Sequence, residues 1–310
     1  MKIKFILKVL SILSMKLLII TLFLGCADTT STTGTVSAQK PRIVLQEDFE
    51  SASKAEMFLK WDDISNPDGM MFSSDVPSGT KGKQSLMMTY SPGQNSGGHL
   101  FKSLPEGYDT LYARFYVKFL TKFSKVHHFV KMGGTNPPSK WPMGNAGKKP
   151  RGDDWFITGI EPMGDRWSWD FYTYWMNMRG YADPNFFWGN SFNPDPPSPH
   201  EQGKWICVEF MMTMNNPVSS SNGEQAFWIN GKKVLHMGKG FPKGYWIWDR
   251  FKPDPDSTGF EGFRWRNTEK LKLNFFWLSY YMTAGKPGEI DKILFDDVIV
   301  STGYVGPLVP

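Results

Sequence analysis

The sequence predicts an all-β protein, an antiparallel β-sandwich or jelly roll. About eleven segments have strand-like composition or alternation, and clusters of Gly, Pro and Asn separate them. Helical periodicity is nearly absent, and only residues 52–61 suggest a turn or two of helix. The expected strands are residues 42–50, 84–90, 98–104, 110–120, 125–132, 154–162, 167–175, 204–214, 225–237, 272–281 and 292–300.

The N-terminus has the character of an export signal. Residues 1–25 contain four lysines, no acid and a short apolar run, which is typical of a signal peptide rather than a spanning helix. The run ends Leu-Phe-Leu-Gly before Cys26 and resembles a bacterial lipoprotein signal, which implies that Cys26 is lipidated. An ordinary cleaved signal followed by a chance cysteine is the alternative. Residues 26–41 read as a Ser/Thr-rich tether, and residues 42–310 as one jelly-roll domain.

These features predict an exported protein, anchored by lipid to a bacterial membrane and facing the periplasm or the cell exterior. Without the signal, 31 basic and 30 acidic residues remain, so the electrostatic signature of nucleic-acid binding is absent. If Cys26 carries lipid, Cys207 has no disulfide partner, and the domain depends on its core for stability. Nothing in the sequence indicates an obligate protein partner.

Alternation along residues 110–120 separates two faces. One set is apolar and is expected in the core, whereas Tyr112, Arg114 and Tyr116 point the other way. An aromatic and cationic face of this kind can stack on a sugar ring and bind a carboxylate. A solvated outer face is the alternative. The expected core set is Leu111, Ala113, Phe115, Val117 and Phe119.

The same rule divides the histidine pair at residues 127 and 128. Neighbouring strand residues face opposite sides, so His127 and His128 cannot share a metal ion without a bulge. His128 falls on the more apolar side and is expected in the core, whereas His127 shares its face with Lys131. No further His or Cys has zinc-like spacing, so a transition-metal site is not expected.

Two further strands present polar side chains away from the core. In residues 167–175, Tyr172 and Tyr174 share one face and lie about 7 Å apart at strand rise. In residues 204–214, Glu209 and Cys207 point outward. Cys207 is expected to be a small packing residue rather than a nucleophile.

Three long loops interrupt the strands, at residues 133–153, 182–203 and 238–268. Loops of this length in a compact domain usually form functional walls or lids, and the aromatic content of these loops favours that role.

Several segments resemble known carbohydrate-active domains. GKWICVEFMMTMNNPV with NGEQAFWINGKKV, and the ending EIDKILFDDVIVSTGYVGP, resemble the concanavalin A-like, or laminin-G-like, jelly roll. Within that superfamily, TLYARFYVKF, HHFVKMGG and FYTYW are similar to polysaccharide lyase family 14. By position, the resemblance implies that Lys131 is the catalytic lysine and that Tyr172 and Tyr174 form the tyrosine pair. The arginine of the family's Ser-x-Arg strand has no counterpart near residues 158–160.

The predicted function is therefore cleavage of an acidic glycan by β-elimination. This reaction needs a base for the C5 proton, a group that stabilises the enolate-like carboxylate, and an acid for the leaving oxygen. Lys131 or His127 could be the base, and Tyr172 or Tyr174 the acid. Arg114 could bind the carboxylate. Tyr112, Tyr116 and Glu209 complete the expected substrate-binding set, and no cofactor is required.

Two other functions and one ion remain open. Glycoside hydrolysis needs two flanking carboxylates, but EPMGD at residues 161–165 has the wrong spacing and GEID at 288–291 lies in a terminal loop. A non-catalytic glycan-binding lipoprotein also fits the aromatic content. Calcium favours carboxylate clusters, so Glu47, Asp48, Asp296 and Asp297 could hold a structural ion where the first and last strands meet, with solvated edge charges as the alternative.

Overall fold

The computed structural model describes residues 41–121, 125–142, 144–163, 168–181, 186–199 and 201–309. The predicted signal, the lipidation site Cys26 and nearly all of the tether lie outside these residues. Within the described ranges, no helix is long and apolar enough to cross a membrane.

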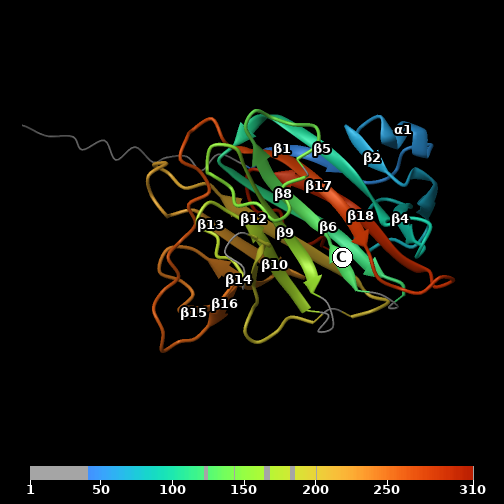
Figure 1. Cartoon of the computed structure of the whole chain (residues 1–310). Helices are drawn as coiled ribbons and strands as arrows, with labels where there is room; N and C mark the ends of the chain where they lie inside the picture. Colours follow the sequence, from blue (N-terminus) through green and yellow to red (C-terminus); the bar gives the residue numbers. More distant parts are fainter. Residues whose placement is uncertain are drawn as a thin grey trace, which may run out of the picture. The chain divides into compact units, whose positions relative to one another are not determined.

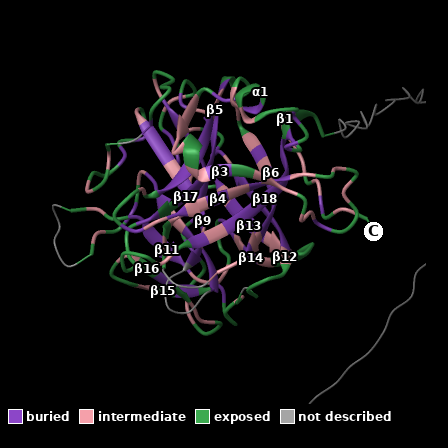
Figure 2. Cartoon of the chain, turned by 90° about the vertical axis from the view of Figure 1, so that its right-hand side faces the viewer, coloured by how far each residue is buried: buried purple, intermediate pink, exposed green. Residues whose placement is uncertain are grey.

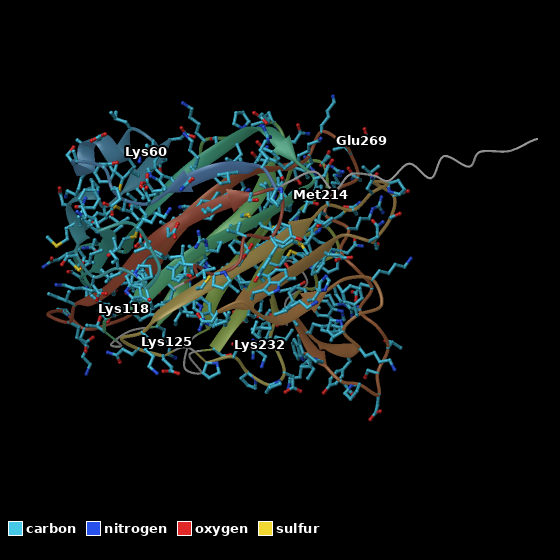
Figure 3. The ribbon with its side chains drawn as sticks, turned by 180° about the vertical axis from the view of Figure 1, so that it is seen from behind. Lys60, Lys118, Lys125, Met214, Lys232 and Glu269 are labelled. Carbon is cyan, nitrogen blue, oxygen red and sulfur yellow. The ribbon has the colours of Figure 1, made fainter. Side chains whose placement is uncertain are left out.

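One layer of the fold is an eight-stranded sheet with the order β14-β13-β12-β6-β18-β4-β3, to which β1 adds by pairing with β18. All pairings in this sheet are antiparallel. Figure 3 shows this sheet from behind, with β18, β6 and β12 side by side. Its strands are β1 (Ile43–Glu47), β3 (Met70–Ser73), β4 (Ser85–Tyr90), β6 (Thr110–Phe119), β12 (Trp205–Thr213), β13 (Glu224–Ile229), β14 (Lys232–Met237) and β18 (Asp291–Ser301).

The second layer is a ten-stranded sheet with the order β15-β16-β11-β10-β9-β8-β17-β5-β2, and β7 pairs with β17. Only the pair β11–β16 is parallel among the described pairings of this sheet. Its strands β5, β17 and β8 lie side by side in Figure 1. The strands are β2 (Asp63–Ser65), β5 (Gly97–Tyr108), β7 (Val126–His128), β8 (Val130–Thr135), β9 (Trp155–Met163), β10 (Ser168–Tyr174), β11 (Asn190–Phe192), β15 (Gly244–Ile247), β16 (Arg250–Pro253) and β17 (Leu273–Met282).

Local sequence accounts for the connecting elements. The short helix α1 (Lys54–Phe58) lies inside the segment predicted as helical, and the hydroxyl of Ser53 accepts a hydrogen bond from the Glu56 N–H at its start. Asn230 and Gly231 both have positive φ, at 49° and 79°, which is the conformation of a tight hairpin turn between β13 and β14. The predicted all-β sandwich is confirmed.

The core lies between the two sheets and is built by alternation. Leu111, Ala113, Phe115, Val117 and Phe119 of β6 are all at most 1% exposed, as predicted. Figure 2 shows buried residues concentrated along the strands and exposed residues along the peripheral loops. Each fully buried large apolar side chain contributes about 1.5–3 kcal/mol, so this core is a large source of stabilisation.

Two charged residues on the outward face of the eight-stranded sheet are covered by other parts of the chain. Arg114 is 2% exposed and its Nη2 lies 3.1 Å from Oδ1 of Asp297. Glu209, 1% exposed, accepts hydrogen bonds from the backbone N–H groups of Val305 and Gly306. The sequence correctly separated the two faces of β6 and β12, but Arg114 and Glu209 are buried. Substrate binding by this face stays a prediction.

Two of the predicted calcium residues are engaged in ion pairs within the protein. Asp297 pairs with Arg114, and the Glu47 carboxylate accepts from Lys60 Nζ at 3.2 Å. In the part of the chain that the structure describes, no group of three or more His, Cys, Asp or Glu side chains could hold a metal ion. Calcium binding at Glu47, Asp48, Asp296 and Asp297 stays a prediction from sequence.

Candidate active site

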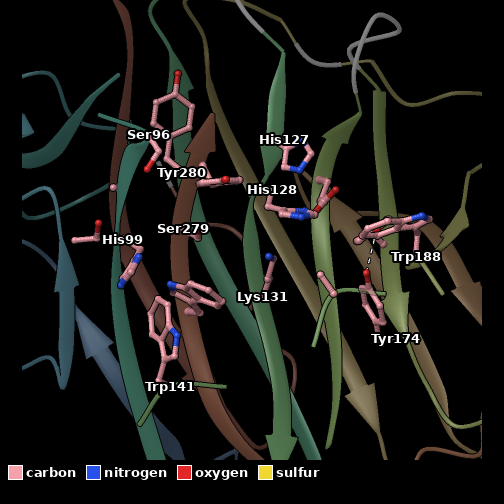
Figure 4. A pocket seen from close by; sticks show the side chains of 17 residues that line it. Ser96, His99, His127, His128, Lys131, Trp141, Tyr174, Trp188, Ser279 and Tyr280 are labelled. Carbon is pink, nitrogen blue, oxygen red and sulfur yellow. Dashed lines mark hydrogen bonds and ion pairs between the residues drawn. The ribbon is translucent and has the colours of Figure 1, made fainter. Parts of the chain in front are cut away.

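A pocket of about 750 Å³ opens on the outward face of the ten-stranded sheet. Its centre is a row of residues paired across neighbouring strands: Trp277 of β17, Lys131 of β8, Gly159 of β9 and Tyr172 of β10. Residues paired across strands share a face, so β-sheet register alone brings these side chains together. Figure 4 shows Lys131 at the middle of the pocket, with His127 and His128 on one side of it.

Lys131 is buried, with 6% of its surface exposed. Burial lowers the pKa of its amine to about 8, although the negative charge of Glu161 acts in the opposite direction. Its Nζ lies 5.0 Å from the centroid of the Trp277 ring, a cation–π distance. An amine with a pKa near neutrality can act as a base or as a cation, so its chemistry depends on its neighbours.

Gly159 keeps the floor of the pocket open between Lys131 and Tyr172. A methyl group at this position would meet Oε1 of Glu161 at 3.1 Å and Cγ of Lys131 at 3.3 Å. Both distances are tighter than ordinary packing, so a larger residue here would displace the two charged side chains. The absence of a side chain at 159 therefore leaves room for Lys131 and Glu161 beside it.

The tyrosine pair lies on the same face, as alternation predicts. The hydroxyl oxygens of Tyr172 and Tyr174 are 3.4 Å apart, and both side chains line the pocket. Burial is the main cause that raises the pKa of both phenols. The phenols therefore stay protonated at neutral pH and can donate a proton to a developing alkoxide.

Both histidines face the pocket, because the strand that carries them is interrupted. β7 ends at His128 and β8 begins at Val130, so Phe129 lies between two strands instead of inside one. Phe129 and Val130 are both fully buried, which breaks the alternation by one residue. The prediction that His128 packs in the core is therefore wrong, and its imidazole lies on the same side as Lys131.

His128 is held by three neighbours. Its Nδ1 lies 2.9 Å from Oε1 of Glu161, its ring centroid lies 5.3 Å from that of Tyr172, and its ring stacks on Tyr281 at 6.0 Å and 16°. His127 packs edge-on against Tyr281 and its ring lies 4.4 Å from that of His128. Burial lowers the pKa of His127, and the neighbouring imidazole of His128 lowers it further.

Aromatic side chains form two walls of the pocket. Trp141, from the loop after β8, is 50% exposed and its ring lies 5.6 Å from Trp277. Trp188, from the loop before β11, is 47% exposed on the other side (Figure 4). Half-exposed aromatic rings around a cavity provide stacking surfaces for sugar rings. The prediction that residues 133–153 and 182–203 supply walls agrees with this position.

A second histidine–carboxylate pair lies at the far end of the pocket. His99 of β5 hydrogen-bonds through Nε2 to Oδ2 of Asp63 at 2.7 Å, and its ring lies 5.5 Å from Trp141. Burial lowers the pKa of His99, against the opposing effect of Asp63. This pair holds the imidazole against the aromatic wall.

The structure brings four of the predicted residues together and leaves four elsewhere. Lys131, His127, Tyr172 and Tyr174 line one pocket. The predicted substrate-binding residues Arg114, Tyr112, Tyr116 and Glu209 belong to the other sheet. Cys207 is buried on that second sheet, and burial raises the pKa of its thiol to about 11, consistent with a packing role.

Sequence reasoning missed His128, Glu161 and the aromatic partners Trp277 and Trp141. Glu161 sits on the strand predicted at residues 154–162, two positions after Gly159, and alternation in that strand would have placed it on the same face as Gly159. The interruption at Phe129 has no comparable local signal, since the residue is a strong strand former.

Comparison with known proteins supports the fold. No protein-family model matches the sequence, and no curated protein matches it. Among solved structures, the chain is similar to the marine PL-14 alginate lyase from Aplysia kurodai, with a TM-score of 0.57, 14% identity, and coverage of 84% of this chain and 100% of that chain.

Two further alginate lyases are similar. The enzyme vAL-1 from Chlorella virus has a TM-score of 0.55 at 12% identity, with 84% of this chain and 100% of that chain covered. Alginate lyase Aly36B has a TM-score of 0.52 at 14% identity, with 83% and 95% covered. At these identities the similarity establishes a shared β-sandwich fold, whose solved examples include polysaccharide lyases.

Proposed function

We propose that the protein is a polysaccharide lyase that cleaves an acidic glycan by β-elimination in the pocket around Lys131. The observation that carries this proposal is the juxtaposition of a buried lysine, two phenols and two imidazoles in one open pocket with tryptophan walls. The fold shared with alginate lyases supports the same reaction class.

The pocket contains the groups that the reaction requires. Tyr172 and Tyr174 are protonated at neutral pH and can donate to the leaving oxygen. Lys131 and His127, the two predicted base candidates, lie on the same side. Trp141 and Trp188 provide stacking surfaces for neighbouring sugars. Arg114 has no part in this proposal, because it is buried in the other sheet.

The test is a panel of acidic and neutral glycans incubated with the mature chain. Elimination creates a double bond that absorbs in the ultraviolet, so a rise in absorbance with an acidic glycan is the expected result. Lys131→Ala should remove that signal. Lys232→Ala, an exposed lysine of β14 in the other sheet, is the matched control and should keep it.

The two alternatives give different results in the same assay. Reducing ends without absorbance would indicate hydrolysis; Glu161 lines the pocket, whereas the second acid of its motif, Asp165, lies outside the described residues. Retention of a glycan with neither signal would indicate a non-catalytic binding protein. Wild-type protein that neither cleaves nor retains any member of the panel would overturn a carbohydrate function.

We further propose that the chain is exported and anchored by lipid at Cys26, facing the periplasm or the exterior of a bacterial cell. The charged, then apolar N-terminus that ends at this cysteine supports the proposal. Expression in a bacterial host with a clickable fatty acid should label the wild-type chain in the membrane fraction. Cys26→Ser should lose both the label and the membrane association, and labelling of the serine variant would contradict the proposal.

A further inference from the structure

Glu161 and His128 form a hydrogen-bonded pair inside the candidate active site rather than on the protein surface. The pair is 2.9 Å long, and its side chains are 12% and 23% exposed. Both residues line the pocket together with Lys131 and Tyr172. A pair with similar distance and composition, His236 with Glu224 at 2.7 Å, lies on β14 and β13 of the other sheet. This second pair does not line the pocket and therefore serves as a control.

The contact with Glu161 determines which ring nitrogen of His128 carries the proton. A carboxylate accepts hydrogen bonds, so the imidazole must donate through Nδ1, and its remaining nitrogen, Nε2, has a free lone pair when the ring is neutral. Stacking on Tyr281 and packing against Tyr172 hold the ring plane in addition. A histidine oriented by a carboxylate in this manner has the arrangement of a general base.

The charges of the pocket point to a different role for Lys131. Among the described residues that line the pocket, Lys131 is the only lysine or arginine. A uronate carboxylate gains negative charge as its neighbouring C5 proton leaves, and a cation must balance it. Lys131 lies in the same row as Tyr172, and Arg114, the predicted carboxylate ligand, is not in this pocket.

We propose that His128, oriented by Glu161, is the base that removes the C5 proton, and that Lys131 is the cation that binds the uronate carboxylate. This inference rests on the proposed lyase function. His128 and Lys131 are then catalytic residues, and Glu161 is a positioning residue that acts through His128.

The step balances without a co-reactant. Nε2 of His128 takes the C5 proton, and the C–H electron pair forms the C4=C5 double bond. The C4–O bond breaks, and the leaving oxygen takes the phenol proton of Tyr172. The imidazolium and phenolate that result exchange a proton through solvent, which restores both groups.

The two roles of Lys131 predict opposite pH dependence. As a base, Lys131 must be neutral, so kcat/KM would rise through its pKa of about 8 and stay high. As a cation, Lys131 must be charged, so kcat/KM falls above about pH 8. The other titratable groups that line this pocket are Glu161 of β9, Tyr172 and Tyr174 of β10, His127 of β7, His99 of β5, and Tyr280 and Tyr281 of β17.

Three variants and one matched control test the assignment on the glycan that the wild-type chain cleaves. His128→Gln should lower kcat/KM at least about 100-fold, and Glu161→Gln about 10- to 100-fold. Lys131→Arg should retain measurable activity and lose the decline above pH 8, because a guanidinium stays charged. Glu224→Gln removes the carboxylate of the counterpart pair and should leave kcat/KM and the pH profile unchanged. Unfolding curves for each variant verify folding.

The outcomes separate this inference from the lyase function itself. Wild-type cleavage that continues to rise above pH 8, with an inactive Lys131→Arg and an active His128→Gln, overturns the inference and keeps the lyase. Absence of cleavage by the wild-type chain overturns both.

Histidine nitrogen NMR gives a readout independent of activity. With ¹⁵N-labelled histidine, His128 of the wild-type chain should be the Nδ1–H tautomer when neutral, and Glu161→Ala should shift it toward the Nε2–H tautomer. Glu161→Gln shows the effect of removing the negative charge alone. Glu224→Gln shows the effect of altering the other histidine–glutamate pair. A neutral His128 that carries its proton on Nε2 in the wild-type chain would overturn the proposed orientation.

Discussion

The outward faces of the two sheets have the same alternating pattern of residues, but one is covered by the chain and the other is open. Each consists of the polar and aromatic half of alternating strands, with Arg114 and Glu209 on the eight-stranded sheet and Lys131 and Glu161 on the ten-stranded sheet. The first face is covered by the C-terminal segment, where Leu308 donates its N–H to the hydroxyl of Tyr116. The second face remains open as a pocket.

The comparison shows that burial of a charge does not by itself identify a functional site. Arg114 is buried beside its own counter-ion, Asp297, with oxygen and nitrogen 3.1 Å apart. Lys131 is also buried, but its Nζ lies over the ring of Trp277, and burial lowers its pKa to about 8. A paired cation contributes to stability, whereas a cation with a lowered pKa that faces a cavity is available for a substrate.

The largest effect on stability is expected from Arg114→Met. Removal of one partner of a buried ion pair leaves Asp297 charged and uncompensated, which costs about 3–5 kcal/mol of the free energy of unfolding. Urea unfolding of the mature chain measures this change. A loss within experimental error of zero would show that the covered face is no more dependent on its charges than the open one.

The opposite pattern is expected for Lys131→Met. The variant removes a buried amine whose ionisation burial disfavours, so the free energy of unfolding should change by no more than about 1 kcal/mol. Elimination activity should fall at least about 100-fold, because a charge that the transition state requires is absent. Unfolding and the ultraviolet assay on the same preparation check both parts. Equal losses of stability in the two methionine variants would break the comparison.

Asp296 should make the stability of the covered face depend on pH. Burial, reinforced by the negative charges of Asp297, Glu50 and Asp48, raises the pKa of this carboxyl to about 8. Between pH about 4 and about 8 the folded chain therefore holds a proton that the unfolded chain has released, and stability falls by about 1.4 kcal/mol per pH unit. Asp296→Asn should flatten that slope, as urea unfolding at several pH values would measure.

The same variant sharpens the calcium prediction. Calcium binds the ionised carboxylate, so an ion at this acidic part of β18 would raise the melting temperature of the wild-type chain at pH 8, and Asp296→Asn would lose that response. Identical melting temperatures with calcium and with a chelator would contradict the predicted ion.

The smallest effect is expected at the aromatic wall. Trp141→Ala should weaken glycan binding about 10-fold, which corresponds to about 1.4 kcal/mol, without loss of stability, because the side chain is half exposed. Met71→Ala, an equally exposed apolar residue of β3 in the other sheet, is the control. Isothermal titration with an oligosaccharide compares the two, and equal affinities would remove Trp141 from the site.

Part of the candidate site could be read from the sequence. Tyr172 and Tyr174 lie on one face because they are two residues apart in an uninterrupted strand, and Lys131 was singled out by its resemblance to a lyase motif. His128 was assigned to the wrong face because Phe129, between β7 and β8, shifts the alternation by one residue. The pairing of β8 with β9, which brings Glu161 close to His128, depends on contacts between segments that are separate in the sequence.

The sequence by itself determined the β-sandwich, the core set of β6, and which side chains point away from that core. These properties depend on a two-residue period and on local turns, which each segment contains in full. Only the tertiary structure decided which outward face is open. Leu308, far away in the sequence, covers Tyr116, whereas Lys131 faces a cavity. The positions of the C-terminal segment and the long loops depend on contacts across the whole fold, which no single segment contains.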